Sequence, residues 1–185
     1  SGNMQTIGFS LYMEMLDEAV TAIREGRTPD FDQTESAHAE VDLKIPALIP
    51  NDYLNDVPLR LELYKRISSA ASEELLSEIE IEMIDRFGLL PPQVKNLFRQ
   101  AKVRLLAEAL GIKQITLGPQ SGRIEFREKT KVDPMVLISL VQSQPDEYKL
   151  DGATALKIIR KTVGTEARFG FIYEVLDVLK RPPTK

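Results

Sequence analysis

Hydrophobic and polar residues alternate along this chain with two different periods, helical in the first part and strand-like in much of the second. Between Phe9 and Glu25, apolar residues recur at helical spacing. Gly26 ends this pattern, and the polar stretch from Arg27 to Ala39 has no period. We therefore expect a helix over residues 9–25 and a linker over residues 27–39.

The middle of the chain carries the signals of three consecutive helices. Ser72, with two glutamates after it, is typical of a helix N-terminus. Gly88 can close a helix in the left-handed conformation, and Pro91 or Pro92 can occupy the first turn of the next one. Helices with such short connections should pack as antiparallel neighbours. The predicted elements are a short strand over 40–46 and helices over 58–70, 72–87 and 91–110.

After Gly111 the spacing changes to the period of β-strands. Two runs of alternating residues surround "GPQSG", and two more surround the turn dipeptide "DG" at 151–152, so each pair predicts a β-hairpin. Asp133 followed by Pro134 indicates a helix start between the hairpins. A last helix is expected over 165–181. The fold class predicted is therefore α+β, with a helical N-terminal half and a small antiparallel sheet from two hairpins, covered by helices on one face.

Composition narrows the function classes. The chain has 185 residues, 43% of them hydrophobic and 28% charged, which are values of a globular domain. It has no cysteine, which excludes disulfides and thiolate metal sites and suits a cytoplasmic location. No apolar run approaches the ~20 residues of a membrane span, and the N-terminus lacks the pattern of a signal peptide. The net charge of −4 argues against nucleic-acid binding as the main role.

The sequence offers little for catalysis. The single histidine, His38, falls in the predicted linker, where a solvated side chain is the expectation. The serines have no neighbouring histidine with which to form a triad, and "GPQSG" lacks the lysine and hydroxyl residue that complete a phosphate-binding loop. We predict that this chain is not an enzyme and holds no catalytic residue, metal site or cofactor.

A basic stripe on the helix 91–110 supports an alternative function. Lys95, Arg99 and Lys102 are spaced by four and three residues, so they share one helical face that could contact phosphates. The same pattern is also typical of a solvated helix face or of a partner for a neighbouring acidic helix. An accessory domain that contacts nucleic acid remains the alternative hypothesis.

An acidic stripe precedes the corner "FGLLPP". Glu74, Glu78, Glu82 and Asp85 line one face of the predicted helix 72–87, and Arg86 is the one cation in that helix. Like charges at this spacing repel, and acids near a helix C-terminus oppose the helix dipole. Either the basic helix after the corner neutralises the stripe within the fold, or an external basic partner does.

Three stretches of the chain resemble the C-terminal domain of bacterial transcription-repair coupling factors, the TRCF domain. They are "IGFSLYMEMLDEAV", "LKIPALIPNDYLNDVPLRLELYKRI" and "IEMIDRFGLLPPQVKNL". The resemblance implies three parts: residues 1–26 as the end of the second lobe of a translocase motor, residues 27–39 as a linker, and residues 40–185 as a regulatory domain.

The resemblance also implies a function and partners. Members of this family are ATP-dependent DNA translocases that displace stalled RNA polymerase and recruit nucleotide excision repair through UvrA. Their C-terminal domain is expected to have no catalytic activity, to mask the UvrA-binding surface on an N-terminal UvrB-like module of the same protein, and to restrain the motor. The resemblance implies that RNA polymerase and DNA are bound by other parts of the parent protein and not by this domain. The family's acidic contacts before the "RFG" corner match Glu82 and Asp85, which adds Glu74, Glu78 and Arg86 as neighbouring candidates for partner binding.

Overall fold

The computed structural model describes residues 38–182, so the predicted helix 9–25 and nearly all of the linker 27–39 lie outside the described residues. By its contacts the chain divides into two units, one containing residues 46–102 and the other residues 41–45 with the chain from Val103 onwards. The assignment of 40–185 to one regulatory domain stays a prediction. The elements are β1 (Glu40–Asp42), α3 (Val57–Ser69), α4 (Glu73–Phe87), α5 (Pro92–Leu110), β2 (Ile112–Leu117), β3 (Ser121–Phe126), α6 (Pro134–Ser143), β4 (Tyr148–Asp151), β5 (Ala155–Ile159) and α7 (Thr165–Lys180).

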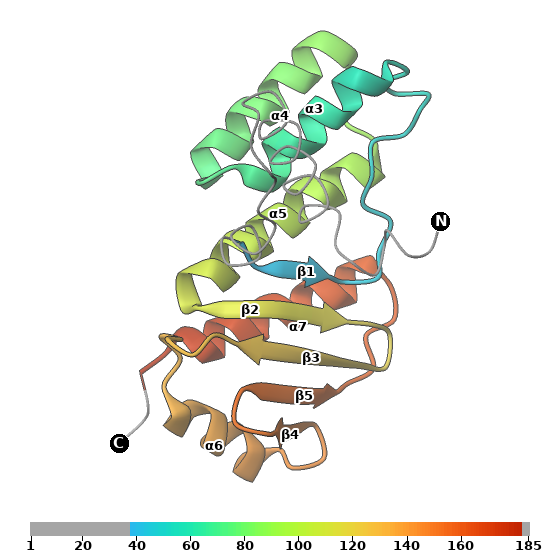
Figure 1. Ribbon diagram of the computed structural model, residues 1–185. Coiled ribbons are helices and arrows are strands. Elements are labelled where there is room, and N and C mark those ends of the chain that lie inside the picture. The colour runs from blue at the N-terminus through green and yellow to red at the C-terminus, as the bar shows by residue number, and fades with distance from the viewer. Residues whose placement is uncertain (1–37, 183–185) are drawn as a thin grey trace, which may run out of the picture. The chain divides into compact units, whose positions relative to one another are not determined.

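The first unit is helical and begins each of its first two helices with a side-chain cap. Asp56 accepts a hydrogen bond from the Leu59 amide at 3.1 Å, and Ser72 accepts one from the Leu75 amide at 3.2 Å. Each cap satisfies an amide that the first helical turn leaves without a partner. Helices α3 and α4 contact each other and lie side by side (Figure 1). Their buried side chains form the core of this unit: Leu63, Ile67, Leu76, Ile79 and Met83.

The second unit contains a five-stranded sheet in the order β1-β2-β3-β5-β4. Both predicted hairpins are present, since β2 pairs antiparallel with β3 and β4 pairs antiparallel with β5. The α+β class is therefore confirmed. One strand adds to the predicted arrangement: β1 lies at the edge beside β2 and runs in the same direction, which makes the sheet mixed (Figure 1).

Strand β1 is shorter than its sequence pattern indicates. Alternation predicted a strand up to Pro46, but the strand ends at Asp42. The Asp42 carboxylate accepts a hydrogen bond from the Lys44 amide at 3.1 Å and forms an ion pair with the Lys44 ammonium at 2.8 Å. Lys44 takes a positive φ of 54°, which turns the chain away from the sheet.

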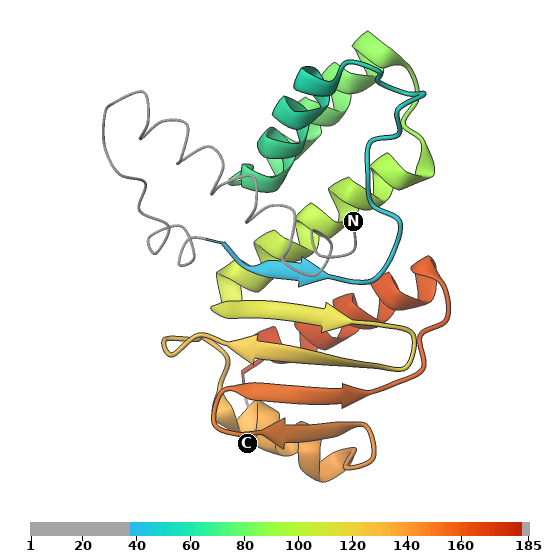
Figure 2. The ribbon, with the colours of Figure 1, turned by 45° about the vertical axis from the view of Figure 1, so that its right-hand side comes forward.

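Helix α7 covers one face of the sheet and also fixes the segment after β1. Figures 1 and 2 both draw α7 behind the strands, and α6 contacts both β4 and α7. Arg168 on α7 is 5% exposed and makes four hydrogen bonds. It donates to the carbonyl oxygens of Leu43 and Lys44, each at 3.0 Å, and to the carbonyl and hydroxyl oxygens of Thr162. This buried charge is satisfied entirely by neutral acceptors of its own unit.

Candidate docking surface

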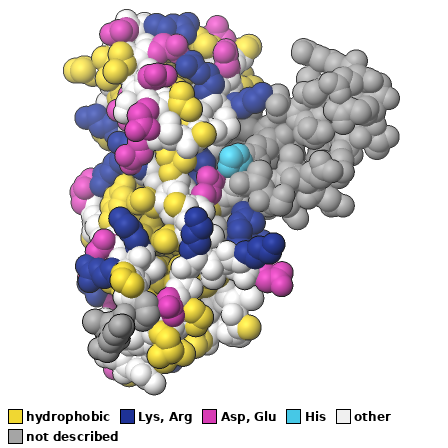
Figure 3. Space-filling view, turned by 90° about the vertical axis from the view of Figure 1, so that its left-hand side faces the viewer, with side chains coloured by type: hydrophobic (Ala, Val, Ile, Leu, Met, Phe, Trp, Pro, Cys, Tyr) yellow, Lys and Arg dark blue, Asp and Glu magenta, His cyan; other side chains and the backbone are white. Residues whose placement is uncertain are grey.

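The predicted acidic stripe lies on helix α4, along one face of the helix, as the spacing of its residues predicts. All four acids fall within its bounds, so Glu74, Glu78, Glu82 and Asp85 follow one another along one face. Glu74, Glu78 and Asp85 are exposed, and Glu82 is half-buried. In Figure 3 the helical unit, at the top, shows acidic, basic and hydrophobic side chains interspersed. The stripe is thus a surface feature of the helical unit.

Glu82 differs from the other acids because cations of its own unit hold it. Its carboxylate accepts a hydrogen bond from Arg66 on α3 at 2.5 Å, and Arg86 lies 3.8 Å away on the same helix. The hydrogen bond from Arg66 is the main cause that lowers the pKa of Glu82 below its ordinary value. Arg86 also lies over the Phe87 ring, 4.9 Å from its centroid. The pair of Arg66 and Glu82 therefore joins α3 to α4. The sequence left two sources of neutralisation open, the helix after the corner or an external partner, and for Glu82 the structure shows a third, α3.

Asp85, Glu78 and Glu74 have no ion pair or hydrogen bond among the residues that the structure describes. Asp85 is the least favourably placed, because it lies in the last turn of α4 where the helix dipole favours cations. These three carboxylates are exposed to solvent. They are the part of the stripe that is available to a partner.

The end of α4 is fixed by Tyr53, which lies in the segment between β1 and α3. The hydroxyl of Tyr53 donates to the carbonyl oxygen of Gly88 at 2.9 Å and lies 3.3 Å from that of Met83. The Tyr53 ring packs edge-on against Phe87, with centroids 6.1 Å apart. Gly88 has a φ of 95°, as expected for the residue that closes this helix. A bond between residues 35 positions apart leaves no local sequence signal, so only the role of Gly88 was predictable.

The basic stripe of the alternative hypothesis also lies on a continuous helix. Lys95, Arg99 and Lys102 are all within α5, which confirms their helical spacing. Lys95 is exposed, whereas Arg99 and Lys102 are half-buried, and Arg99 already interacts within the chain. A contact with phosphates through these residues stays a prediction.

The structure shows the surroundings of the single histidine of the chain and whether side chains in residues 38–182 are grouped to bind a metal ion. His38 is half-buried and has a partner within the chain. Within residues 38–182, no group of three or more histidine, aspartate or glutamate side chains is placed to hold a metal ion. No helix in this part of the chain is long and apolar enough to cross a membrane.

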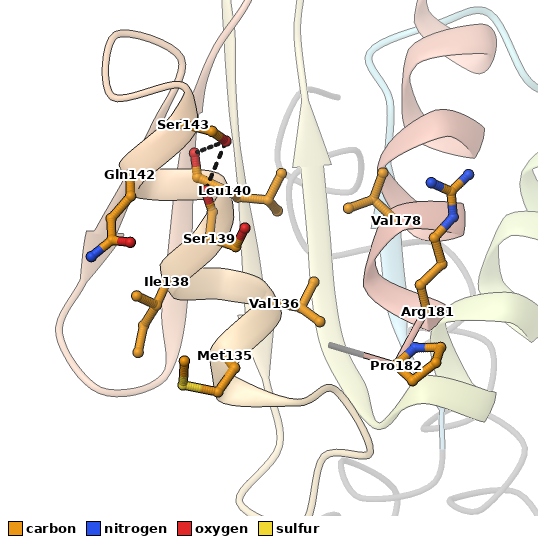
Figure 4. Close-up of a pocket in the computed structure, with 10 residues that line it drawn as sticks. All are labelled: Met135, Val136, Ile138, Ser139, Leu140, Gln142, Ser143, Val178, Arg181 and Pro182. Atoms are coloured by element: carbon orange, nitrogen blue, oxygen red, sulfur yellow. Dashed lines mark hydrogen bonds between the residues drawn. The ribbon is translucent and has the colours of Figure 1, made fainter. Parts of the chain in front are cut away.

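A groove of about 550 Å³ lies between α6 and the end of α7 (Figure 4). Met135, Ile138 and Val178 are among the aliphatic side chains that line it, and Arg181 lies at its rim, paired with Asp177 at 2.6 Å. Its lining among the described residues contains no carboxylate or imidazole. The groove can accept an apolar group, and the polar side chains in its lining are Ser139, Gln142, Ser143 and Arg181.

A comparison with known protein families shows to which family this chain belongs. The model of the TRCF domain matches residues 43–137, just over half of the chain. The chain belongs to the TRCF domain family. The match includes α4 with its acidic stripe, Tyr53, and the corner that follows Gly88.

Relatives of this TRCF domain are named transcription-repair-coupling factors, in agreement with the resemblance seen in the sequence. The chain is 44% identical over 179 residues to the transcription-repair-coupling factor of Haemophilus influenzae and 45% identical over 180 residues to that of Escherichia coli. Each alignment covers 97% of this chain and 16% of the relative. The chain therefore spans about a sixth of the length of these relatives.

A solved structure has the same fold. The crystal structure of the C-terminal domain of a transcription-repair coupling factor superposes with a TM-score of 0.58 at 20% sequence identity. The superposition covers 77% of this chain and 94% of that domain. The predicted fold class and family of this TRCF domain are therefore both confirmed.

Proposed function

We propose that this chain is a non-catalytic, autoinhibitory module of a transcription-repair coupling factor. In this proposal the outer face of α4 docks on an N-terminal UvrB-like module of the same protein, masks its UvrA-binding surface and restrains the motor. Release would expose the surface to UvrA when the translocase acts on stalled RNA polymerase. DNA and RNA polymerase would be contacted by other parts of the parent protein.

The observation that carries this proposal is the row of unpaired carboxylates on α4. Glu74, Glu78 and Asp85 are exposed and without partners in the described chain, and Asp85 opposes the dipole of its helix. A basic surface would neutralise them, and charge complementarity would set the orientation of docking. Because the two modules belong to one chain, tethering raises their effective concentration, so a weak contact is sufficient and can be released.

The test uses the full-length parent protein with charge reversals on α4. We expect Glu78→Lys with Asp85→Lys to increase UvrA binding and the basal rate of ATP hydrolysis, because the masked surface opens. Glu62→Lys is the matched control, since Glu62 is an exposed acid on α3. Unchanged UvrA binding in the double variant would mean that this face does not mask the site.

The alternative hypothesis has its own measurement. If Lys95, Arg99 and Lys102 contact phosphates, titration of fluorescent DNA with this chain should show binding that weakens steeply as salt rises. Under the masking proposal we expect no such binding at physiological salt.

A further inference from the structure

Three large aliphatic side chains are exposed beside the unpaired acids of α4. Ile81 is 60% exposed, Ile84 is 38% exposed, and Leu89, just beyond the helix end, is 86% exposed. Ile81, Ile84 and Asp85 are helical neighbours because they are separated by three and four residues. The amide of Gly88 donates to the carbonyl of Ile84 at 3.0 Å, which continues the helical hydrogen bonding up to Gly88. Leu89 is the next residue, so it lies at the C-terminal end of α4.

The fold leaves Ile81 and Leu89 largely uncovered, whereas it covers more than half of Ile84. The core side of α4 is formed by Leu76, Ile79 and Met83, which are at most 5% exposed. Isoleucine has a lower helix propensity than glutamate or lysine, so the exposed Ile81 gives up helix stability with little gain in packing. An apolar row at this position is therefore better explained by a contact outside the unit.

We propose that Ile81, Ile84 and Leu89 form the apolar centre of the docking surface, with Glu78 and Asp85 at its edge. This inference rests on the proposed function and specifies the partner's chemistry: a protein surface with an apolar depression bordered by lysines or arginines. The unpaired carboxylates select a basic protein surface, because they would repel both the phosphates of nucleic acids and anionic lipids.

The two kinds of side chain have separate effects in this surface. The carboxylates set orientation and partner choice, whereas the aliphatic groups supply affinity once water leaves them. Binding energy in protein interfaces is concentrated in a few central, desolvated residues. Because burial of apolar surface does not depend on screening, part of the affinity should persist at high salt.

The test is a binding titration of this chain with the separately produced N-terminal UvrB-like module. Ile81→Ser and Leu89→Ser should each weaken binding about tenfold, since each removes one buried aliphatic contact. Val163→Ser is the matched control, because Val163 is 69% exposed and belongs to the sheet unit. Thermal unfolding of each variant should match that of the wild type, as expected for changes at exposed positions.

The outcomes separate this inference from the proposed function. If the wild-type chain binds and Asp85→Lys weakens binding, but Ile81→Ser and Leu89→Ser bind as tightly as the wild type, the apolar centre is refuted and the masking function stands. If the wild-type chain shows no binding even at about millimolar concentrations of the module, which is the effective concentration that tethering can supply, the proposed function fails and the inference fails with it. A tenfold loss in both serine variants, with the control unchanged, supports both.

Discussion

Arg168 in the sheet unit and Asp85 in the helical unit are charged side chains in opposite environments: one is buried and hydrogen-bonded, and the other is exposed. Arg168 is 5% exposed, and its guanidinium donates four hydrogen bonds to oxygens of its own unit. Asp85 is exposed and has no ion pair or hydrogen bond within the described residues. Glu82, three residues before it, is held by Arg66 and Arg86.

The difference separates charges that build the fold from charges that are free for a partner. Burial of a charge is costly unless its hydrogen-bonding capacity is met, and Arg168 meets that condition inside its unit. Asp85 carries an unfavourable dipole interaction with no compensation in the described structure. Such local conflicts are expected at functional sites, where a gain elsewhere offsets them. The following variants test this division, in order of decreasing effect on stability.

The largest effect is expected for Arg168→Met. Methionine keeps much of the side-chain length, but it leaves the carbonyl oxygens of Leu43, Lys44 and Thr162 without their donor. We expect a loss of ~2–4 kcal/mol in the free energy of unfolding, measured by urea denaturation. Arg181→Ala is the control, because Arg181 is exposed and its pair with Asp177 lies on the surface, so a change under ~0.5 kcal/mol is expected. Equal effects of the two variants would contradict the structural role of Arg168.

Tyr53→Phe should have an intermediate effect. The change removes only the hydroxyl that bonds to the carbonyl of Gly88. The expected loss is ~0.5–1.5 kcal/mol of stability, again from urea denaturation. Unchanged stability would show that the carbonyl exchanges its tyrosine partner for water without cost.

Asp85→Lys should change stability in the opposite direction. Replacing an acid by a cation in the last turn of α4 improves the interaction with the helix dipole, so we expect a gain of ~0.3–1 kcal/mol in the isolated chain. Glu62→Lys, in the middle of α3, should have almost no effect. A loss of stability in Asp85→Lys would mean that Asp85 has a structural role after all, and the comparison with Arg168 would no longer hold.

The smallest effect concerns pH and Glu82. Its pKa is lowered by the hydrogen bond from Arg66, so its stabilising contribution is complete above the ordinary value of 4.5 and is lost as pH falls through the lower value of the folded chain. The difference in melting temperature between the wild type and Glu82→Gln should therefore be largest near neutral pH and vanish in strong acid. The same difference should shrink at high salt, because both partners are partly exposed. A difference that grew on acidification would exclude the ion pair as its cause.

Sequence alone predicted the features that depend on neighbouring residues. Ser72 and Asp133 cap their helices as expected, and Gly111 follows the end of α5 with a positive φ. Both hairpins were predictable from alternation and turn residues. The acidic stripe was predictable too, because residues spaced by four within one helix must share a face.

The remaining features depend on contacts between distant parts of the chain. The four bonds of Arg168 include two to residues more than 120 positions away, and nothing near Arg168 indicates them. Arg66 neutralises Glu82 from another helix, so the sequence could not show which acid of the stripe is held and which remain free. Lys44 ended β1 early through a backbone conformation that its residue type does not favour.

The central claim is that Asp85 is free for a partner whereas Glu82 is not. Its most direct test is the affinity of this chain for the N-terminal UvrB-like module, measured for wild type, Asp85→Lys and Glu82→Gln at physiological salt. We expect Asp85→Lys to weaken binding at least about tenfold, because like charges then face each other across the interface. Glu82→Gln should bind nearly as tightly as the wild type. Wild-type affinity in Asp85→Lys, or a greater loss in Glu82→Gln, would contradict the account.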